Sequence, residues 1–100
     1  MQEYLDMLLP DHWDSMDVYK RRDYVRDADD PMRPDGSVRR IEVSNMEIWC
    51  ECFGKAKEDM KPSDSYAISA IMERIAGWSK TGKAKILPIY GRQRIYKRDE

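Results

Sequence analysis

The chain has 100 residues, of which 41% are hydrophobic and 37% are charged, and its formal net charge is −1. This length and composition indicate one small globular domain. No apolar run approaches the roughly 20 residues that a membrane-spanning helix needs, and the N-terminus lacks the basic-then-apolar pattern of a signal peptide. We therefore expect a cytoplasmic protein with no membrane partner.

Few residues are suited to metal binding or nucleophilic catalysis. His12 is the only histidine, and Cys50 and Cys52 are the only cysteines. Two positions apart on a helix, the two thiols point about 200° away from each other, so we expect one buried and one partly exposed free thiol. Zinc sites and Cys–His or Ser–His catalysis lack their parts. We expect no catalytic residue, metal or cofactor in this chain.

The first 37 residues are predicted to form a helical extension that ends in a loop. A short helix is expected over residues 2–9, where Pro10 ends it, and a second from residue 14 or 15 to residue 28. The apolar face of the first helix is expected to be Tyr4, Leu5, Leu8 and Leu9. The basic residues of the second helix alternate with aspartates, so we expect them on a solvated face. Residues 29–37 hold two prolines, three aspartates and a glycine, which is typical of a loop.

The middle of the chain carries the clearest local signals. Val38 to Val43 alternates apolar and charged residues, which predicts a short strand. Ser44 and Glu47 then have the spacing of a capping box at the start of a helix. The buried face of that helix is expected to be Met46, Trp49, Cys50 and Phe53, and Gly54 its end. We expect Glu51 to be solvated.

A second amphipathic helix is predicted after a polar connection of about eight residues. Ser63 is its expected cap and Gly77 its end. Its buried face is expected to consist of Ile68, Ile71, Met72 and Ile75. Trp78 is expected to fold back on the core. Two such helices in succession favour a helix-turn-helix pair.

The C-terminal residues are predicted to form a β-hairpin. Segments 85–90 and 93–97 flank Gly91-Arg92, a dipeptide suited to a two-residue turn, and Pro88 places its strand at a sheet edge. We therefore predict an α+β fold that is mainly helical and winged-helix-like, with a helix-turn-helix, a C-terminal hairpin wing and an N-terminal helical extension. Residues 1–37 are the extension and residues 38–100 the winged-helix-like domain, together one compact domain.

Positive charge is gathered at the predicted wing. Residues 80–98 hold seven basic side chains and no acidic one, whereas residues 1–79 carry a net charge of −6. A basic wing suits the phosphate backbone of DNA; alternatively, basic residues protect an edge strand from aggregation. The candidate nucleic-acid contacts are Lys83, Lys85, Arg92, Arg94, Lys97 and Arg98, with Ser65 and Ser69 on the second helix. That helix is close to charge-neutral, which favours backbone contacts over base readout.

Residues 77–84 nearly spell the phosphate-binding motif GxxxxGK[ST], but Ala84 stands where the magnesium-holding hydroxyl is needed. The motif also requires a strand before it and a helix after it, and here the expected order is reversed. We therefore predict that this segment binds no nucleotide.

Three segments carry a family resemblance. They are Glu47-Ile48-Trp49-Cys50-Glu51-Cys52-Phe53-Gly54, Pro88-Ile89-Tyr90-Gly91-Arg92-Gln93-Arg94 and Leu8-Leu9-Pro10-Asp11-His12-Trp13, with a helix that ends in Gly77-Trp78 between the first two. They resemble the C-terminal end of the virulence-associated protein E family, which comprises primase/helicase-like replication proteins of phages and genomic islands. The resemblance implies a C-terminal tail domain, with the family's P-loop ATPase domain outside this chain.

Two functional hypotheses follow. In the first, this non-catalytic module brings a phage or mobile-element replication helicase onto DNA through phosphate contacts, and its partners are DNA and the ATPase domain of the parent chain. In the second, it is a protein-docking module that joins the helicase to a primase, a neighbouring subunit or a host factor. The anchors would then be Trp13, Tyr19 and Tyr24.

Overall fold

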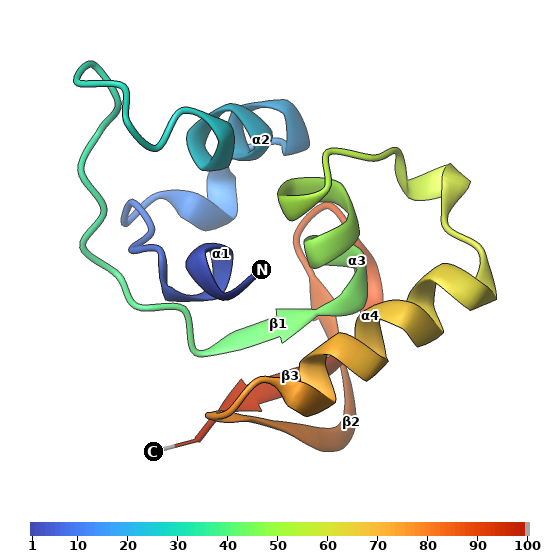
Figure 1. Cartoon of the computed structure of the whole chain (residues 1–100). Helices are drawn as coiled ribbons and strands as arrows, with labels where there is room; N and C mark the ends of the chain where they lie inside the picture. The colour runs from blue at the N-terminus through green and yellow to red at the C-terminus, as the bar shows by residue number, and fades with distance from the viewer. Residues whose placement is uncertain (100) are drawn as a thin grey trace.

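The computed structural model describes residues 1–99, which form helices and one antiparallel sheet (Figure 1). The elements are α1 (Gln2–Asp6), a 3₁₀ turn (Trp13–Ser15), α2 (Val18–Arg26), β1 (Glu42–Ser44), α3 (Asn45–Glu47), a π-helical turn (Ile48–Cys52), a second 3₁₀ turn (Lys57–Asp59), α4 (Pro62–Arg74), β2 (Trp78–Leu87) and β3 (Gly91–Arg98). The predicted α+β class is confirmed. Within the described part of the chain, every helix is too short or too polar to cross a membrane.

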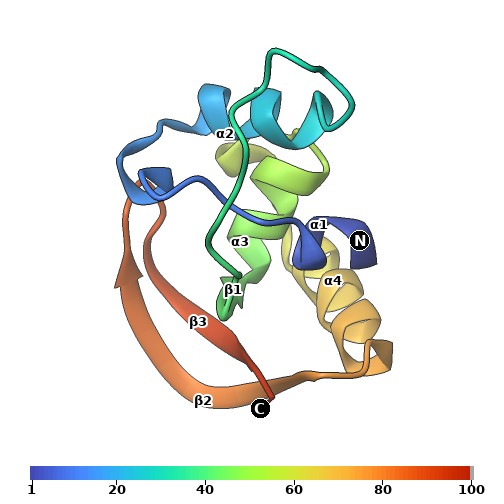
Figure 2. The same cartoon turned by 90° about the vertical axis from the view of Figure 1, so that its left-hand side faces the viewer.

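The sheet has the strand order β1-β3-β2, and both pairings are antiparallel. In the register, Val43 of β1 lies opposite Tyr96 of β3, and Lys80 of β2 lies opposite the same residue. An irregularity between Lys80 and Ala84 interrupts the pairing of β2 with β3. Figure 2 shows the hairpin as a strongly curved ribbon whose inner side faces α3 and α4.

The hairpin turn differs from the prediction. Leu87 pairs with Gly91, so the turn is formed by residues 88–90, and the predicted turn at Gly91-Arg92 is wrong. Ile89 has a positive φ of 74°, and Tyr90 is only 2% exposed. The turn thus ends on the buried Tyr90, and Gly91, with a φ of +73°, follows it as the first residue of β3. Pro88 lies in this turn, where its missing N–H removes no ladder hydrogen bond.

The N-terminal elements are shorter than predicted. Helix α1 ends at Asp6, and Leu8 is 49% exposed instead of sharing its buried face. Leu9 continues as extended backbone and forms an isolated antiparallel bridge with Val38. Helix α2 begins after Asp17, whose side chain accepts a hydrogen bond from the Lys20 amide. A capping aspartate, rather than the apolar pattern, sets this start.

Strand β1 covers only the end of the segment predicted as a strand. Val43 is buried as predicted, but the rest of the predicted alternation is wrong: Val38 and Ile41 are exposed, whereas Arg40 is 3% exposed. The reason is that Arg40 turns inward to two buried carboxylates, Glu47 and Glu51. Ionic partners on the following helical segment thus outweigh the hydrophobic pattern of the strand.

The capping box at Ser44 and Glu47 is confirmed, with both reciprocal hydrogen bonds present. Beyond it the chain takes a π-helical turn, in which the Phe53 amide donates to the carbonyl of Ile48. A π-turn has more residues than an α-turn, so the buried face rotates. Trp49 and Cys50 are buried as predicted, but Ile48 and Glu51 are buried as well and Phe53 is exposed, contrary to the predicted face. Cys50 is buried and Cys52 half-buried, as predicted, and both are free thiols.

Helix α4 begins at Pro62, one residue earlier than predicted. Asp64 accepts a hydrogen bond from the Lys61 amide, so Lys61 and not Ser63 is the capping position. Ile68 and Met72 are fully buried, whereas Ile71 is 40% exposed, which makes the buried face narrower than predicted.

Among residues 1–99, the larger of two hydrophobic clusters joins both predicted parts of the chain, and the smaller one, formed by Leu9, Trp13 and Tyr24, lies within the extension. Tyr4 and Leu5 of α1 pack in the same cluster as Val43, Ile68 and Trp78. The predicted packing of Trp78 on the core is confirmed. Because the extension supplies core residues, it is part of the same packed unit, whose radius of gyration of 13.1 Å is that of a compact chain of this length.

The carboxylate of Glu51, which we expected to be solvated, is fully buried. Its side chain has 0% exposure. It accepts hydrogen bonds from Tyr4 Oη and Tyr90 Oη, both at 2.7 Å, and from Arg21 Nη1 at 3.1 Å. Arg40 Nη2 lies 3.7 Å from its Oε1 atom. This network ties α1, α2, the segment before β1 and the hairpin turn to the π-helical turn.

Replacing Glu51 by Ala should destabilise the fold by about 3–5 kcal/mol, because the buried guanidinium of Arg21 would lose its carboxylate partner and that of Arg40 would keep only Glu47. Urea unfolding followed by circular dichroism measures the change. Glu58→Ala removes an exposed carboxylate from the same region and should shift the unfolding free energy by less than about 0.5 kcal/mol. Equal effects of the two substitutions would contradict the central role of this network.

Candidate functional site

A groove of about 640 Å³ lies between α4 and the hairpin. Arg92, Arg94 and Tyr96 alternate along β3 and so share one face of the strand. Tyr96 Oη donates to Ser69 Oγ of α4 at 3.0 Å, which fixes the orientation of this face. The groove is lined by Asn45, Ser65, Tyr66, Ser69, Ala70, Glu73, Lys80, Gly82, Arg92, Gln93, Arg94, Ile95 and Tyr96.

The charge of the groove is positive. Its lining contains three basic side chains and one acidic side chain, Glu73, which pairs with Lys80 at 3.2 Å. Arg92 and Arg94 are both exposed, and among residues 1–99 neither forms a salt bridge. Two arginines therefore remain available to an anionic ligand.

The serines predicted as contacts lie on the opposite wall. Asn45 Nδ2 donates to Ser69 Oγ at 2.9 Å and to Ser65 Oγ at 3.1 Å, which joins α3 to α4. Both serines are half-buried and already hydrogen-bonded. Their hydroxyl groups hold the walls of the groove together rather than project toward a ligand.

The other predicted contacts lie elsewhere. Lys83 is exposed at the irregularity of β2, where its amide donates to Thr81 Oγ1. Lys97 alternates with Tyr96 and so lies on the other face of β3 from the groove. Lys85 pairs with Glu42 at 2.8 Å, away from the groove lining. Of the predicted contacts, the groove thus contains Ser65, Ser69, Arg92 and Arg94, together with Lys80, which was not predicted. The other predicted contacts do not line the groove.

Arg98 has an internal role. Its Nε donates to the Arg40 carbonyl and its Nη2 to the Leu5 carbonyl, both at 2.7 Å. The guanidinium also lies over the ring of Trp78. Arg98 holds the end of β3 against α1. Because its side chain is only 10% exposed, it is poorly placed to contact a phosphate.

The aromatic anchors of the docking hypothesis are mostly internal. Trp13 and Tyr24 are 7% and 4% exposed and pack edge-to-face. They are core residues, so only Tyr19, 71% exposed, remains from that set. Tyr66 of α4 is 75% exposed and lines the groove. Tyr66 was not among the predicted contacts, although its position outside the apolar spacing of α4 indicates that its side chain is exposed.

A second cavity of about 340 Å³ lies beside the buried network. Arg21, Arg40, Glu47 and Tyr90 line part of it. Burial raises the pKa of Glu47 to about 7, and the negative charge of Glu51 adds to this effect. Burial likewise raises the pKa of the Tyr90 phenol, which therefore acts as a donor at neutral pH.

The three segments that carry the family resemblance meet at this buried network. Tyr90 donates to Glu51, and Arg21 donates to the carbonyl of Trp13 at 2.9 Å. No protein-family model matches the chain, and a search of curated proteins found no match. The resemblance therefore stays a prediction, and its residues have a structural role in this fold.

The segment that resembles a phosphate-binding loop is extended. Residues 78–87 form β2, with Gly82 at a φ of +71° within its irregularity. A phosphate-binding loop instead curls around the anion between a strand and a helix. In the part of the chain that the structure describes, His, Cys, Asp and Glu side chains do not assemble in the threes that could hold a metal ion.

The raised pKa of Glu47 predicts a pH-dependent stability. The unfolded carboxyl ionises near pH 4.5 and the folded one near pH 7, so the folded state holds more protons between these values. Stability should therefore fall as pH rises from about 4.5 to about 7. Glu47→Gln, which resembles the protonated form, should flatten this fall, and the exposed Glu58→Gln should not. Urea midpoints at pH 5, 6, 7 and 8 measure it; an unchanged profile in Glu47→Gln would contradict the assignment.

The isolated chain should neither bind nor hydrolyse ATP. Its nearest approach to a nucleotide motif is a β-strand that lacks the magnesium-holding hydroxyl, with Ala84 in that place. Isothermal titration calorimetry with Mg-ATP should give no binding heat. Micromolar binding that Lys83→Ala abolishes would overturn this expectation.

Proposed function

We propose that this chain is a non-catalytic, winged-helix-like nucleic-acid-binding module that holds DNA through phosphate contacts. In line with the family resemblance, it would serve as the C-terminal module of a phage or mobile-element replication helicase or primase. The observation that carries the proposal is the groove between α4 and β3, where Arg92 and Arg94 are exposed without acidic partners.

The order of the elements supports a winged-helix-like reading. Helix α2 is followed by β1, two helical segments, and the hairpin β2–β3. Strand β1, which precedes the helical pair, adds to the hairpin on the β3 side. This is the pairing expected when the strand before a helix-turn-helix joins the wing.

The anchored hairpin turn alters the expected mode of contact. Because Tyr90 is buried against Glu51, the turn does not project as a free wing tip. The inner face of the hairpin, with Arg92 and Arg94, instead faces α4 across the groove. Phosphates would therefore bind along β3 and not at the turn.

The near-neutral helix α4 supports backbone contact over base readout. Its groove-lining residues are Ser65, Tyr66, Ser69, Ala70 and Glu73. Direct base recognition typically uses Arg, Lys, Asn or Gln side chains, which these positions lack. We therefore expect weak, salt-sensitive binding with little sequence preference.

Fluorescence anisotropy with unrelated DNA duplexes tests the proposal. The logarithm of the affinity should fall linearly with the logarithm of salt concentration. Replacing Arg92 and Arg94 by Ala should weaken binding to all duplexes about equally and lower the slope by roughly one unit per lost phosphate contact. Both residues are exposed, so the fold should be kept.

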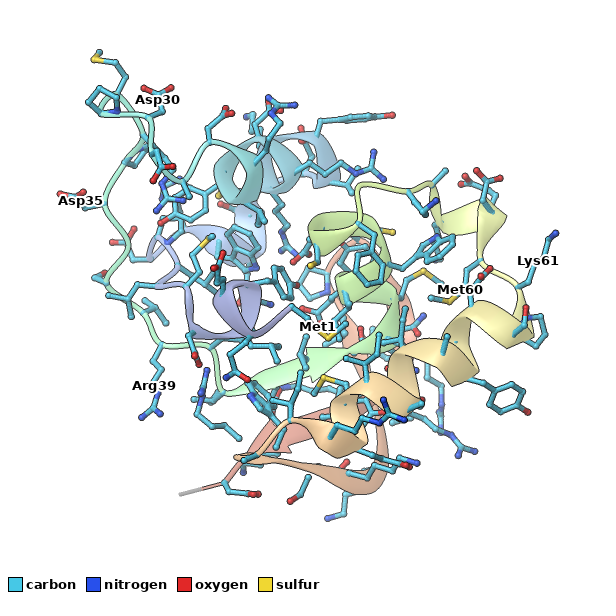
Figure 3. The ribbon with its side chains drawn as sticks, in the orientation of Figure 1. Met1, Asp30, Asp35, Arg39, Met60 and Lys61 are labelled. Carbon is cyan, nitrogen blue, oxygen red and sulfur yellow. The ribbon has the colours of Figure 1, made fainter. Side chains whose placement is uncertain are left out.

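A matched control removes two positive charges outside the groove. Lys20→Ala with Arg39→Ala changes two exposed residues; Figure 3 shows Arg39 on the loop before β1, pointing away from α4. This variant should keep most of the affinity. Equal losses in both variants would indicate a general charge effect, and absence of binding by the wild type at low salt would favour the docking module instead.

A further inference from the structure

The second cavity has a chemistry that the proposed phosphate contact does not use. It lies between the segment before β1, the first 3₁₀ turn and the last residues of β2, and its volume is about 340 Å³. This volume is at the lower end of the range for small-ligand pockets. None of the four predicted contacts in the groove, Ser65, Ser69, Arg92 and Arg94, lines it.

Two buried arginines bring spare hydrogen-bond donors to this cavity. Arg21 and Arg40 are 2% and 3% exposed. The Nε of Arg21 and the Nε and Nη2 of Arg40 have no hydrogen-bond acceptor within residues 1–99. Arg40 approaches Glu47 and Glu51 only to 3.5 and 3.7 Å, longer than the roughly 2.8 Å of a charge-assisted hydrogen bond. Since buried donors almost always have acceptors, these N–H groups suit an anion that enters the cavity.

The other walls favour a small apolar body. They include Leu9, Trp13, Val38, Leu87, Pro88 and Tyr90. The guanidinium of Arg40 lies 5.5 Å from the centre of the Trp13 ring, so the charged and apolar parts of the lining are adjacent. A ligand that fills the space must therefore join an anionic group directly to a compact apolar group.

The acidic residues of the lining limit the ligand to a single negative charge. Glu42 is paired with Lys85, and the raised pKa of Glu47 reduces its negative charge near neutral pH. Asp14 is exposed and also lines the cavity. A dianionic phosphate would be repelled by these groups more than a carboxylate, and it carries no apolar surface.

We propose that this cavity binds a carboxylate attached to a compact branched or aromatic group. The planar guanidinium of Arg40 matches the geometry of a carboxylate, and the apolar group packs against Trp13 and Leu87. The same chemistry is present in a free carboxylic acid and at the C-terminus of a peptide that ends in a hydrophobic residue. This site is independent of the proposed binding of DNA.

NMR titration of the whole chain tests the site with 4-methylpentanoate as the probe. Trp13 is the only tryptophan that lines the cavity, so its indole N–H signal should shift with saturation while those of Trp49 and Trp78 stay. The amide 4-methylpentanamide lacks the charge, and inorganic phosphate lacks the apolar group. Each should therefore bind with an affinity at least about tenfold lower than that of 4-methylpentanoate.

A variant that fills the cavity keeps the test independent of the buried network. Val38 is 45% exposed and lines the cavity, so Val38→Trp should fill it without disturbing the core. It should weaken 4-methylpentanoate binding about tenfold or more, as should Arg40→Gln, whereas Val38→Thr should leave binding unchanged. If Arg40→Gln does not fold, Val38→Trp decides alone. DNA affinity should be equal in Val38→Trp and wild type.

Two further probes distinguish the sources of the carboxylate. A tetrapeptide that ends in leucine is compared as the free acid and as the C-terminal amide. Binding of the peptide acid but not its amide would identify a chain end as a ligand, and binding of 4-methylpentanoate alone would identify a free acid. The proposal is overturned if 4-methylpentanoate causes no saturable shift of Trp13, if its amide binds equally, or if Val38→Trp binds it unchanged.

Discussion

The buried carboxylate of Glu51 is the constraint on which the arrangement of this small fold depends. It receives hydrogen bonds from Tyr4, Arg21 and Tyr90, residues that belong to α1, α2 and the hairpin turn. The carboxylate therefore holds the N-terminal extension and the hairpin against the same π-helical turn. From the turn that it holds, β3 runs past α4 and forms one wall of the basic groove (Figure 2).

This network serves the uniqueness of the fold more than its net stability. Desolvation of a buried ion pair offsets much of the attraction between its charges, and apolar replacements are often equally stable. Apolar side chains at these positions, however, would not specify which tyrosine or which turn packs against the residue at position 51. A carboxylate with three hydrogen-bond donors and a neighbouring guanidinium does specify it, because any other arrangement leaves a charge unpaired in the interior.

Much of the fold could be predicted because its signals are local. The capping box at Ser44, the buried position of Trp78 and the difference between Cys50 and Cys52 depend on neighbours in the sequence. The errors arose where a distant partner overrides the local pattern. Glu51 and its two tyrosines are separated by 47 and 39 residues, a relation that no spacing rule reveals. The π-helical turn likewise shifted a face that had been predicted from α-helical spacing.

The candidate site could be predicted in part for a similar reason. Charge segregation along the sequence pointed to the hairpin, and alternation along β3 places Arg92 and Arg94 together in the groove. The same segregation could not show that Arg98 caps carbonyl groups of other segments or that Lys85 pairs with Glu42. Those roles depend on tertiary contacts. A count of positive charges therefore overestimates the surface available to a polyanion.

The convergence of distant segments on one carboxylate also affects how the molecule opens. If α1, α2 or the hairpin turn detached alone, Glu51 would lose a donor while its remaining partners stayed in the interior. Such partial opening adds the cost of an unsatisfied buried charge, whereas frayed ends and loops normally open at little cost. Amide protons in these three segments should thus exchange with solvent more slowly than those of segments that make no contact with this carboxylate.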